Sequence, residues 1–302
     1  MNEIPFVKDV AFKYGKADAL SPLITRVIAE NPGPYTYTGS GTYIVGSAGP
    51  LAIIDPGPDL DDHIDATVRA IGERNVSHIF VTHTHKDHCG GAAKLADRVN
   101  APTFAASGHP VKDKTVDAPA LDEGADYGFS PDYKITHEEV FKGPECSIEV
   151  VATPGHLSNH FCFCLCEEKS LFTGDHIMGW ATTVIAPPDG DMADYFDSLD
   201  LLLNRDDEIY FPTHGAPIEK PHRFVRAVRT HRKIRDGQIL EQLRRGQTNI
   251  KEIVAVLYAD IDKRLHIAAA LNVLAHLERL VKIGDVACVS GTGMNGTYKS
   301  TL

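Results

Sequence analysis

This 302-residue sequence has little of what marks secreted, fibrous or membrane proteins. Its six cysteines include no Cys-x-x-Cys pair of the metal-binding type. Cys162, Cys164 and Cys166 alternate along an expected strand, so they would share one face rather than form a disulfide framework. No long apolar span occurs, and Met1 to Lys8 show no charged-then-apolar leader. We therefore expect reduced thiols, a cytoplasmic location and no membrane partner.

The sequence also lacks internal repeats, heptad runs and low-complexity tracts. With 43% hydrophobic residues, it can bury one substantial core and a small second domain. The net charge of −11 conceals an uneven distribution. Residues 1–220 contain 16 basic and 34 acidic residues, a net charge of −18, whereas residues 221–302 contain 14 and 7, a net charge of +7. An acidic region is thus followed by a basic C-terminal region.

What the sequence does contain is a dense group of potential metal ligands. The apolar segment 77–81 is expected to be a strand, and it would deliver the next loop to the edge of a sheet where active sites of α/β proteins collect. Two histidines spaced two residues apart can reach one ion, and the aspartate and histidine that follow can reach a second. Gly90 and Gly91 let the backbone turn tightly before a helix expected over 92–98. The four ligands are His83, His85, Asp87 and His88.

Three later strand ends supply further ligands. Each expected strand is apolar, breaks at small residues and is followed by a histidine or an aspartate. A single histidine after a strand is a weak signal, but together with the first loop these residues form a set. The pattern predicts a hydrolytic site with two metal ions. The segments run from Glu149 to His156, from Lys169 to Asp175 and from Glu208 to His214.

At these residues the chain resembles the metallo-β-lactamase superfamily, whose H-x-H-x-D-H signature matches positions 83–88. The resemblance implies an α/β fold, an αββα sandwich of two mixed sheets with helices outside, over residues 1–218. It also implies that Asp175 bridges two ions. The first ion would be held by His83, His85 and His156, and the second by Asp87, His88 and His214.

The two ions would dictate the chemistry. Two divalent cations that share a water lower its pKa toward neutrality and polarise a carbonyl or phosphoryl oxygen. The expected nucleophile is a metal-bridging hydroxide, with Asp175 at the bridge and Asp87 able to orient the nucleophile or receive its proton. Zinc suits imidazole and carboxylate ligands best, so we expect two Zn²⁺ ions, although iron and manganese use similar ligands. For His160 and His176, a substrate-facing or ligand-orienting role and a scaffold role both stay open.

Two positions separate branches of the superfamily. Asp175 stands where a cysteine or serine would point to true β-lactamases, and His85 stands where flavodiiron oxidoreductases carry glutamate. The resemblance therefore favours hydrolysis of something other than an antibiotic. The motifs N-P-G-P at 31–34, G-x-x-T-Y-x-V-G at 39–46 and I-D-P-G at 54–57 look like the opening of the β-lactamase-like protein 2 group. Leu157 and Cys89 depart from that group's pattern and could alter the pocket or the surroundings of the metals.

Beyond residue 218 the pattern changes to helices. The segment 221–245 predicts a long helix that Gly246 ends, and Asn249 followed by Glu252 predicts the start of a second. Asp262 is expected to cap a third helix, which Gly284 stops. The segments 286–289 and 297–298 would pair as a hairpin. Three helices and a terminal hairpin resemble a winged-helix module, so we expect a second domain over residues 219–302.

The basic residues of this region concentrate on its first helix, and two roles stay open for them. Their three- to four-residue spacing places several on one helix face, which could hold substrate phosphates. Equally, a basic module could dock against the acidic domain. The residues are Arg223, Arg226, Arg229, Arg232, Lys233 and Arg235.

Three functions remain. The preferred one is a zinc-dependent hydrolase of a small-molecule thioester, ester or lactone. The resemblance also implies an endoribonuclease acting on single-stranded RNA, but the acidity of the chain and the lack of aromatics interleaved with the basic residues weaken this alternative. The third is a nucleic-acid-binding protein that works through its winged-helix module, which a complete set of seven ligands disfavours. The sequence leaves the substrate and the oligomeric state open.

Overall fold

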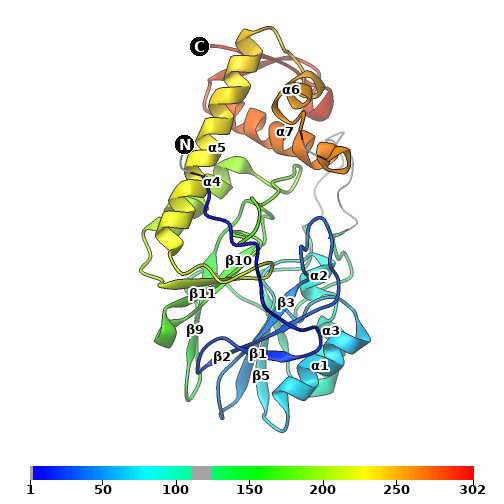
Figure 1. Ribbon diagram of the computed structural model, residues 1–302, viewed down its shortest axis with the longest axis vertical. Coiled ribbons are helices and arrows are strands. Elements are labelled where there is room, and N and C mark those ends of the chain that lie inside the picture. Colours follow the sequence, from blue (N-terminus) through cyan, green and yellow to red (C-terminus); the bar gives the residue numbers. More distant parts are fainter. Residues whose placement is uncertain (1–2, 111–123, 261) are drawn as a thin grey trace.

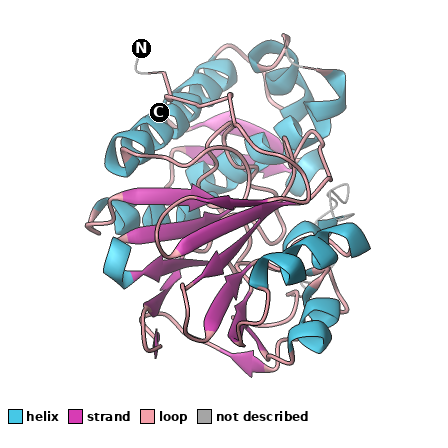
Figure 2. Cartoon of the chain, turned by 60° about the horizontal axis from the view of Figure 1, so that its bottom comes forward, coloured by secondary structure: helices cyan, strands magenta, loops and turns pink. Residues whose placement is uncertain are grey.

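The computed structural model describes residues 3–110, 124–260 and 262–302. Two mixed β-sheets lie face to face, helices cover the outer face of each sheet, and a helical module extends from one end (Figures 1 and 2). The predicted αββα sandwich and the C-terminal helical module with its hairpin are therefore confirmed. Among the described residues, no helix is both long enough and apolar enough to cross a membrane.

The first sheet runs in sequence order, and its described part has seven strands. The strands from β1 to β4 pair antiparallel, and those from β4 to β7 pair parallel. Because β4 and β5 are parallel, the loops that follow them leave the same edge of the sheet. The strands are β1 (Ala17–Ala19), β2 (Ile24–Ile28), β3 (Gly41–Val45), β4 (Leu51–Ile54), β5 (Val76–Phe80), β6 (Thr103–Ala105) and β7 (Tyr133–Lys134).

The second sheet has five strands in its described part, in the order β12-β11-β10-β9-β8. β11 and β12 pair parallel, and the other neighbours pair antiparallel. Cys162 and Cys164 lie on β10 and face the same core, as expected. Cys166 lies in the 3-10 turn after that strand, so it does not share their face. All six cysteines are free, as expected. The strands are β8 (Val140–Lys142), β9 (Ser147–Ala152), β10 (Phe161–Leu165), β11 (Ser170–Gly174) and β12 (Ile209–Pro212).

Three apolar layers hold the sandwich together. Between the sheets, Tyr43 and Phe80 pack against Phe163, Phe172 and their neighbours. Helices α1 and α3 cover the outer face of the first sheet, and α4 with the first half of α5 (Pro221–Arg244) covers the outer face of the second. Burying one large apolar side chain contributes about 1.5–3 kcal/mol, so these layers fix the strand ends that carry the predicted ligands. The helices are α1 (Asp61–Ile71), α2 (Lys86–Cys89), α3 (Ala92–Val99) and α4 (Met192–Leu203).

The C-terminal module has its own core, formed by α5, α6, α7 and a two-stranded hairpin. The predicted start of α6 is confirmed, because Asn249 accepts a hydrogen bond from the amide of Glu252 and Glu252 accepts one from Thr248. The third helical segment begins directly after Asp262 with a 3-10 turn (Lys263–Leu265), and α7 follows from His266, so the cap expected at Asp262 stays a prediction. The elements are α5 (Pro221–Arg244), α6 (Ile250–Leu257), α7 (His266–Lys282), β13 (Val286–Ser290) and β14 (Thr297–Ser300).

Helix α5 belongs to both parts of the molecule. Phe224, Val225 and Val228 in its first half pack with α4 against the second sheet, whereas Ile239 and Leu243 in its second half pack with α6 and α7. In Figure 1 the helix runs along the sandwich and on into the C-terminal module. The helix therefore contributes side chains to both cores.

Candidate metal centre

The predicted ligands converge because four strands end at the same edge of the sandwich. β5 leads to His83 and His85, and the short helix α2 that follows carries Asp87 and His88. β9, β11 and β12 each end shortly before one further ligand. The seven side chains fall into two groups whose donor atoms lie within 4.8 Å of one another. One group is His83, His85, His156 and Asp175, and the other is Asp87, His88 and His214.

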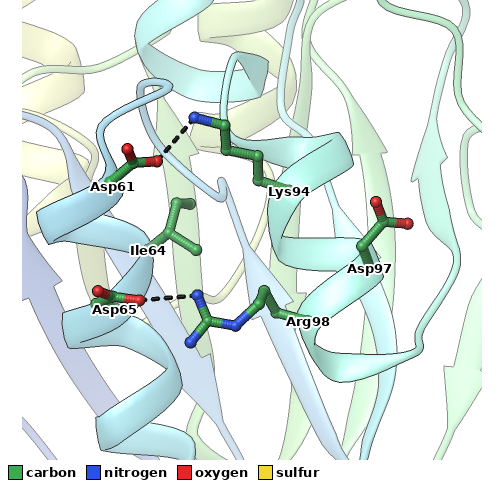
Figure 3. A pocket seen from close by; sticks show the side chains of 6 residues that line it. All are labelled: Asp61, Ile64, Asp65, Lys94, Asp97 and Arg98. Carbon is green, nitrogen blue, oxygen red and sulfur yellow. Dashed lines mark hydrogen bonds and ion pairs between the residues drawn. The ribbon is translucent and has the colours of Figure 1, made fainter.

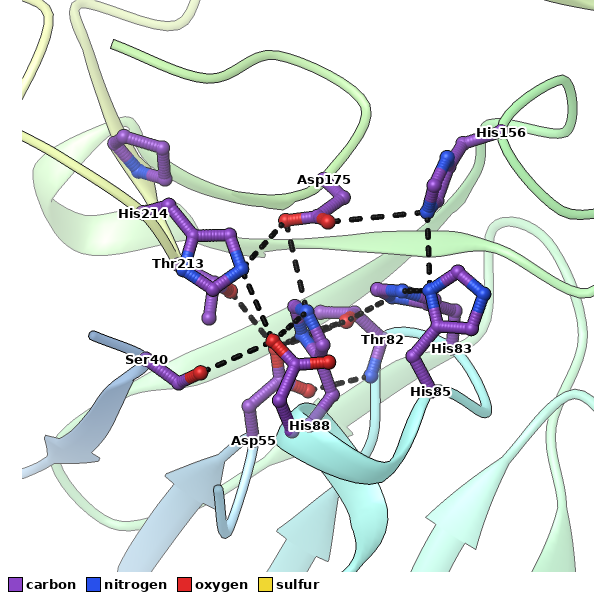
Figure 4. Close-up of polar contacts among 12 residues, drawn as sticks. Ser40, Asp55, Thr82, His83, His85, His88, His156, Asp175, Thr213 and His214 are labelled. Atoms are coloured by element: carbon purple, nitrogen blue, oxygen red, sulfur yellow. Dashed lines mark hydrogen bonds and ion pairs between the residues drawn. The ribbon is translucent and has the colours of Figure 1, made fainter. Parts of the chain in front are cut away.

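The first group is formed mainly by imidazole nitrogens (Figure 4). Nε2 of His83 lies 2.9 Å from Nδ1 of His85, which lies 3.2 Å from Nε2 of His156. Nε2 of His156 lies 3.8 Å from Oδ2 of Asp175. One oxygen of the Asp175 carboxylate, Oδ2, therefore faces the imidazoles of the first group.

The second group receives the other oxygen of the same carboxylate. Oδ1 of Asp175 lies 3.5 Å from Nε2 of His88 and 3.3 Å from Nε2 of His214. Oδ2 of Asp87 lies 3.4 Å and 3.2 Å from the same two nitrogens. Ser40 donates a hydrogen bond of 3.0 Å to that Asp87 oxygen. Asp175 thus stands between the two groups, with one oxygen directed toward each.

This arrangement fits divalent metal ions. Nitrogen atoms bound at about 2.0–2.1 Å to one tetrahedral zinc ion lie about 3.3 Å apart, close to the separations within each group. Nε2 of His88 and Oδ1 of Asp175 are also buried, and neither has a hydrogen-bond partner among the described residues. Because unpaired buried polar atoms are costly, cations between these atoms would compensate both.

The outer nitrogens of the histidines are held by hydrogen-bond acceptors. Nδ1 of His88 donates to Oδ2 of Asp55 at 2.8 Å, and Nδ1 of His156 donates to the carbonyl of Val184 at 2.7 Å. Nδ1 of His214 donates to the carbonyl of Gly39 at 3.2 Å. Since carboxylate and carbonyl oxygens only accept, these contacts place the proton on Nδ1 and leave Nε2 as a lone-pair donor. Three rings are thus fixed in the form that binds a metal.

Asp55 is the support that the sequence reasoning missed. Its buried carboxylate accepts hydrogen bonds from the amide and hydroxyl of Thr82, from the hydroxyl of Thr213 and from His88, at 2.8–2.9 Å. Its φ of 53° lies in the left-handed region, a strain of about 1–3 kcal/mol that the surroundings must offset. Two signals were available: Asp55 ends an apolar strand as Asp175 does, and a threonine directly precedes both His83 and His214.

Electrostatics differ between the two groups. Burial, followed by the neighbouring histidines, lowers the pKa of His83 well below its usual value and that of His85 to about 3. Burial also lowers the pKa of His88, but Asp87 and Asp175 outweigh it, so the net pKa is raised. His83 and His85 are therefore neutral imidazoles. In the second group a bound dication would take the place of the proton that the carboxylates favour on His88.

His160 and His176 do not belong to the two groups. Nε2 of His160 accepts a hydrogen bond from the amide of Asp175 at 3.2 Å, and its Nδ1 contacts the hydroxyl of Thr153 at 2.9 Å. His176 is fully buried 4.7 Å from the ring of Tyr195. Both contacts favour the scaffold role that the sequence left open. Cys89 is also buried, and burial followed by the nearby Asp126 raises the pKa of its thiol, which disfavours a thiolate ligand.

Other polar clusters are already neutralised internally. A hollow between α1 and α3 is lined by charged side chains, but Lys94 pairs with Asp61 and Arg98 pairs with Asp65 (Figure 3). A third group of potential donors, Glu149 with Cys164 and Cys166, faces Arg205, which pairs with Glu149 at 2.9 Å. The metal centre is therefore best placed at the strand ends.

The basic residues of α5 do not form one exposed face. Arg223, Arg226 and Lys233 are exposed, whereas Arg232 is buried. Arg229 pairs with Asp200 of α4 at 2.6 Å. For Arg229, this contact favours the role of docking against the acidic domain over a role in holding phosphates.

Comparisons with known proteins agree with this geometry. The profile of the Metallo-beta-lactamase superfamily matches residues 36–214, and that of the Beta-lactamase associated winged helix domain matches residues 250–292. A "Beta-lactamase-like protein 2 homolog" of Drosophila melanogaster is 30% identical over 88% of this chain and 90% of its own length. An "Atrochrysone carboxyl ACP thioesterase" of Aspergillus chevalieri is 30% identical over 80% of this chain and 75% of its own length.

Solved structures show the same fold. A metallo-beta-lactamase family protein from Thermus thermophilus aligns with a TM-score of 0.73 and 21% identity, covering 93% of this chain and 100% of that one. A beta-lactamase domain protein from Burkholderia ambifaria aligns with a TM-score of 0.76 and 18% identity, covering 97% and 96%. Both alignments include the C-terminal module as well as the sandwich, since each covers more than nine tenths of this chain.

Proposed function

This chain belongs to the metallo-beta-lactamase superfamily of hydrolases, and from that premise we propose that it is a dinuclear zinc enzyme that cleaves an ester-like acyl bond, a thioester above all. The observation that carries the proposal is the position of Asp175, which directs one carboxylate oxygen toward each of two donor groups. A single-metal site would not need a carboxylate shared in this way.

We propose the following assignment of ligands. Asp175 would be the ligand shared by both ions, and its backbone amide donates a hydrogen bond to the His160 ring. When bound, two such cations acidify a shared water and polarise the acyl oxygen of a substrate. Iron or manganese would fit the same donors, so zinc is the preferred metal because of the imidazole-rich set. The first ion takes His83, His85 and His156, and the second takes Asp87, His88 and His214.

Asp87 is the proposed acceptor of the proton that leaves the attacking water. Its side chain is 24% exposed, twice the 12% of Asp175, so it borders the solvent-accessible side of the centre. Ser40 donates to one carboxylate oxygen and thereby orients the group. Burial raises the pKa of Asp87, but His88 and His214 outweigh burial and lower it, so the carboxylate is ionised.

The preference for a thioester rests on the relatives. Several proteins about 30% identical to this chain are named acyl-carrier-protein thioesterases, and one matches 80% of it. The contacts of α5 weaken the RNA alternative, because Arg229 and Arg232 are engaged inside the molecule and are not free to bind phosphates. A role as a nucleic-acid-binding protein would leave the seven converging donors unexplained.

A substrate panel on zinc-loaded protein tests the proposal. We expect hydrolysis of acyl thioesters on a phosphopantetheine carrier or a short analogue, weaker hydrolysis of esters and lactones, and no cleavage of single-stranded RNA. His85→Ala should remove both metal and activity, because it takes away a donor of the first group. Activity that persists in metal-free protein would refute the metal mechanism, and cleavage of RNA with no thioester turnover would favour the endoribonuclease.

A further inference from the structure

Arg232 of α5 is a buried cation with an unusual set of partners. Its side chain is 1% exposed, and its guanidinium lies 5.3 Å from the centre of the Tyr195 ring. In the part of the chain that the structure describes, no carboxylate lies within ion-pairing distance of it. Removing a guanidinium from water without a carboxylate partner is costly, so the groups to which it donates matter.

One of those groups lies on the loop between β11 and α4, and the other lies on α7. Nη2 of Arg232 donates to the carbonyl of Thr183. Nη1 donates to Oδ1 of Asn272 on α7 at 3.4 Å, and the same oxygen accepts a hydrogen bond from the amide of Ile185 at 3.4 Å. One side chain from α5 and one from α7 therefore hold residues 183–185 from the C-terminal side.

Two of these three loop residues also contact proposed ligands of the candidate metal centre. The hydroxyl of Thr183 donates to the backbone carbonyl of Asp175 at 2.7 Å. The carbonyl of Val184 accepts the Nδ1 proton of His156 at 2.7 Å. Thr183 is 2% exposed and Ile185 is fully buried, so water cannot easily substitute for a lost contact. Only two hydrogen bonds thus separate Arg232 from each of two proposed ligands.

We propose that Arg232, together with Asn272, is a positioning residue for the metal centre: it fixes the loop 183–185 and thereby the ring of His156 and the backbone of Asp175. The C-terminal module then completes the first donor group in addition to covering the sandwich. This inference rests on the proposed metal centre. This role requires the two terminal nitrogens of a guanidinium, because one donates to Thr183 and the other donates to Asn272.

The test compares metal affinity among full-length variants. Each protein is loaded with Co²⁺, titrated with a competing chelator, and followed by the absorption of the bound ion and by the melting temperature. Arg232→Met should weaken one of two ions about 10- to 100-fold, the usual effect of losing an outer partner of a ligand. Arg232→Lys should recover part of the affinity, because an ammonium can donate to Thr183 but cannot reproduce the fork.

Arg229→Gln is the matched control. Arg229 lies one turn away on the same helix and joins α5 to α4 through Asp200, but no described contact links it to the loop. It should lower the melting temperature slightly and leave both ions bound as tightly as in the wild type. Equal loss of metal in this variant and in Arg232→Met would overturn the inference, because any loosening of α5 would then suffice.

Asn272→Ala provides a second route if Arg232→Met does not fold. It removes the acceptor shared by Arg232 and Ile185 and should weaken one ion several-fold. Wild-type affinity and an unchanged Co²⁺ spectrum in both variants would refute the positioning role alone. Wild-type protein that binds no Co²⁺ would refute the proposed metal centre, and the inference with it.

Discussion

The two donor groups share Asp175 but differ in what holds one histidine of each, His88 in the second group and His156 in the first. In the second group, His88 donates to the buried carboxylate of Asp55, which also accepts hydrogen bonds from Thr82 and Thr213. In the first group, His156 donates to a backbone carbonyl of the loop 183–185, which Arg232 and Asn272 hold from the C-terminal module. One group is braced by strands of the sandwich and the other by a neighbouring region.

This difference separates two ways of organising a ligand. A buried carboxylate supplies charge as well as geometry, so it raises the basicity of the histidine that it holds. A backbone carbonyl supplies geometry alone, and its position depends on whatever fixes the loop. We therefore expect the second group to respond to changes within the sandwich and the first to respond to changes in α5 and α7.

Asp175→Ala should have the largest effect, because this residue belongs to both groups. Without its charge the two cations would face each other with less compensation, and both should bind more weakly. Activity should fall by at least about 100-fold, more than the loss expected for an outer partner. Metal content and turnover of the purified variant would check this.

Asp191→Ala is a control for that variant, since Asp191 caps α4 through the amides of Ala193 and Asp194. It should cost about 1 kcal/mol of stability and leave the metal content unchanged. An Asp175→Ala protein that retains two tightly bound ions would contradict the bridging assignment.

Asp55→Ala should weaken the second group more than the first, which it reaches only through the contact of Thr82 with His83 at 3.1 Å. The proton of His88 and the hydroxyls of Thr82 and Thr213 would lose their acceptor, which should weaken one ion about 10- to 100-fold. Unpaired buried donors should also cost about 1–3 kcal/mol of stability. Chelator titration and urea denaturation measure the two effects, and equal weakening of both ions would show that the groups are not supported separately.

Lowering the pH should reduce the free energy of unfolding through His63. This side chain contacts Thr42 at 2.8 Å and packs against Gly57, where an added Cβ would lie 2.6 Å from its ring. Burial lowers the pKa of His63 to about 4 from 6.5. Because the folded pKa lies below the unfolded one, its contribution is complete above pH 6.5 and is lost as the pH falls toward 4.

The loss should amount to about 3 kcal/mol. Urea denaturation of metal-free protein between pH 7 and pH 4 measures it, with His63→Asn as the comparison. The free energy of unfolding of the variant should depend less steeply on pH. An identical slope in both proteins would show that His63 does not cause the loss of stability.

Replacing the exposed charges of α5 should have the smallest effect. Arg226→Gln with Lys233→Gln changes side chains that face solvent, so stability should stay within about 0.5 kcal/mol and metal affinity should not change. At low salt, the KM for a phosphate-bearing thioester should rise at most a few-fold, with no change for a small neutral ester. A loss of metal in this variant would show that exposed charges of α5, and not the buried Arg232, affect metal binding.

The sequence predicted the fold and the convergence of the site because both depend on side-chain chemistry at strand ends. A histidine or aspartate after an apolar strand is visible in the sequence, and parallel pairing of β4 with β5 and of β11 with β12 brings such residues to one edge. Which ligand binds which ion stays a prediction. The role of Asp55 was within reach, since it follows the same pattern.

Other features could not be predicted from spacing. The carbonyls of Val184 and Gly39 orient two ligands, and a backbone acceptor leaves no trace in residue type. Arg226, Arg229 and Arg232 recur every third residue, yet only packing against α4 and α7 makes one exposed, one paired and one buried. The domain boundary at residue 218 also stays a prediction.

Helix α5 has a consequence for the order in which the protein is completed during synthesis. Its 24 residues extend about 36 Å, its first half closes the outer layer of the second sheet, and Ala275 of α7 joins that same layer. When residue 218 has left the ribosome, α4 can already pack on this sheet, but the side chains of α5 and α7 that complete the layer have not emerged. Part of the apolar face therefore stays exposed until some 60 further residues emerge, which takes several seconds at about 5–20 residues per second.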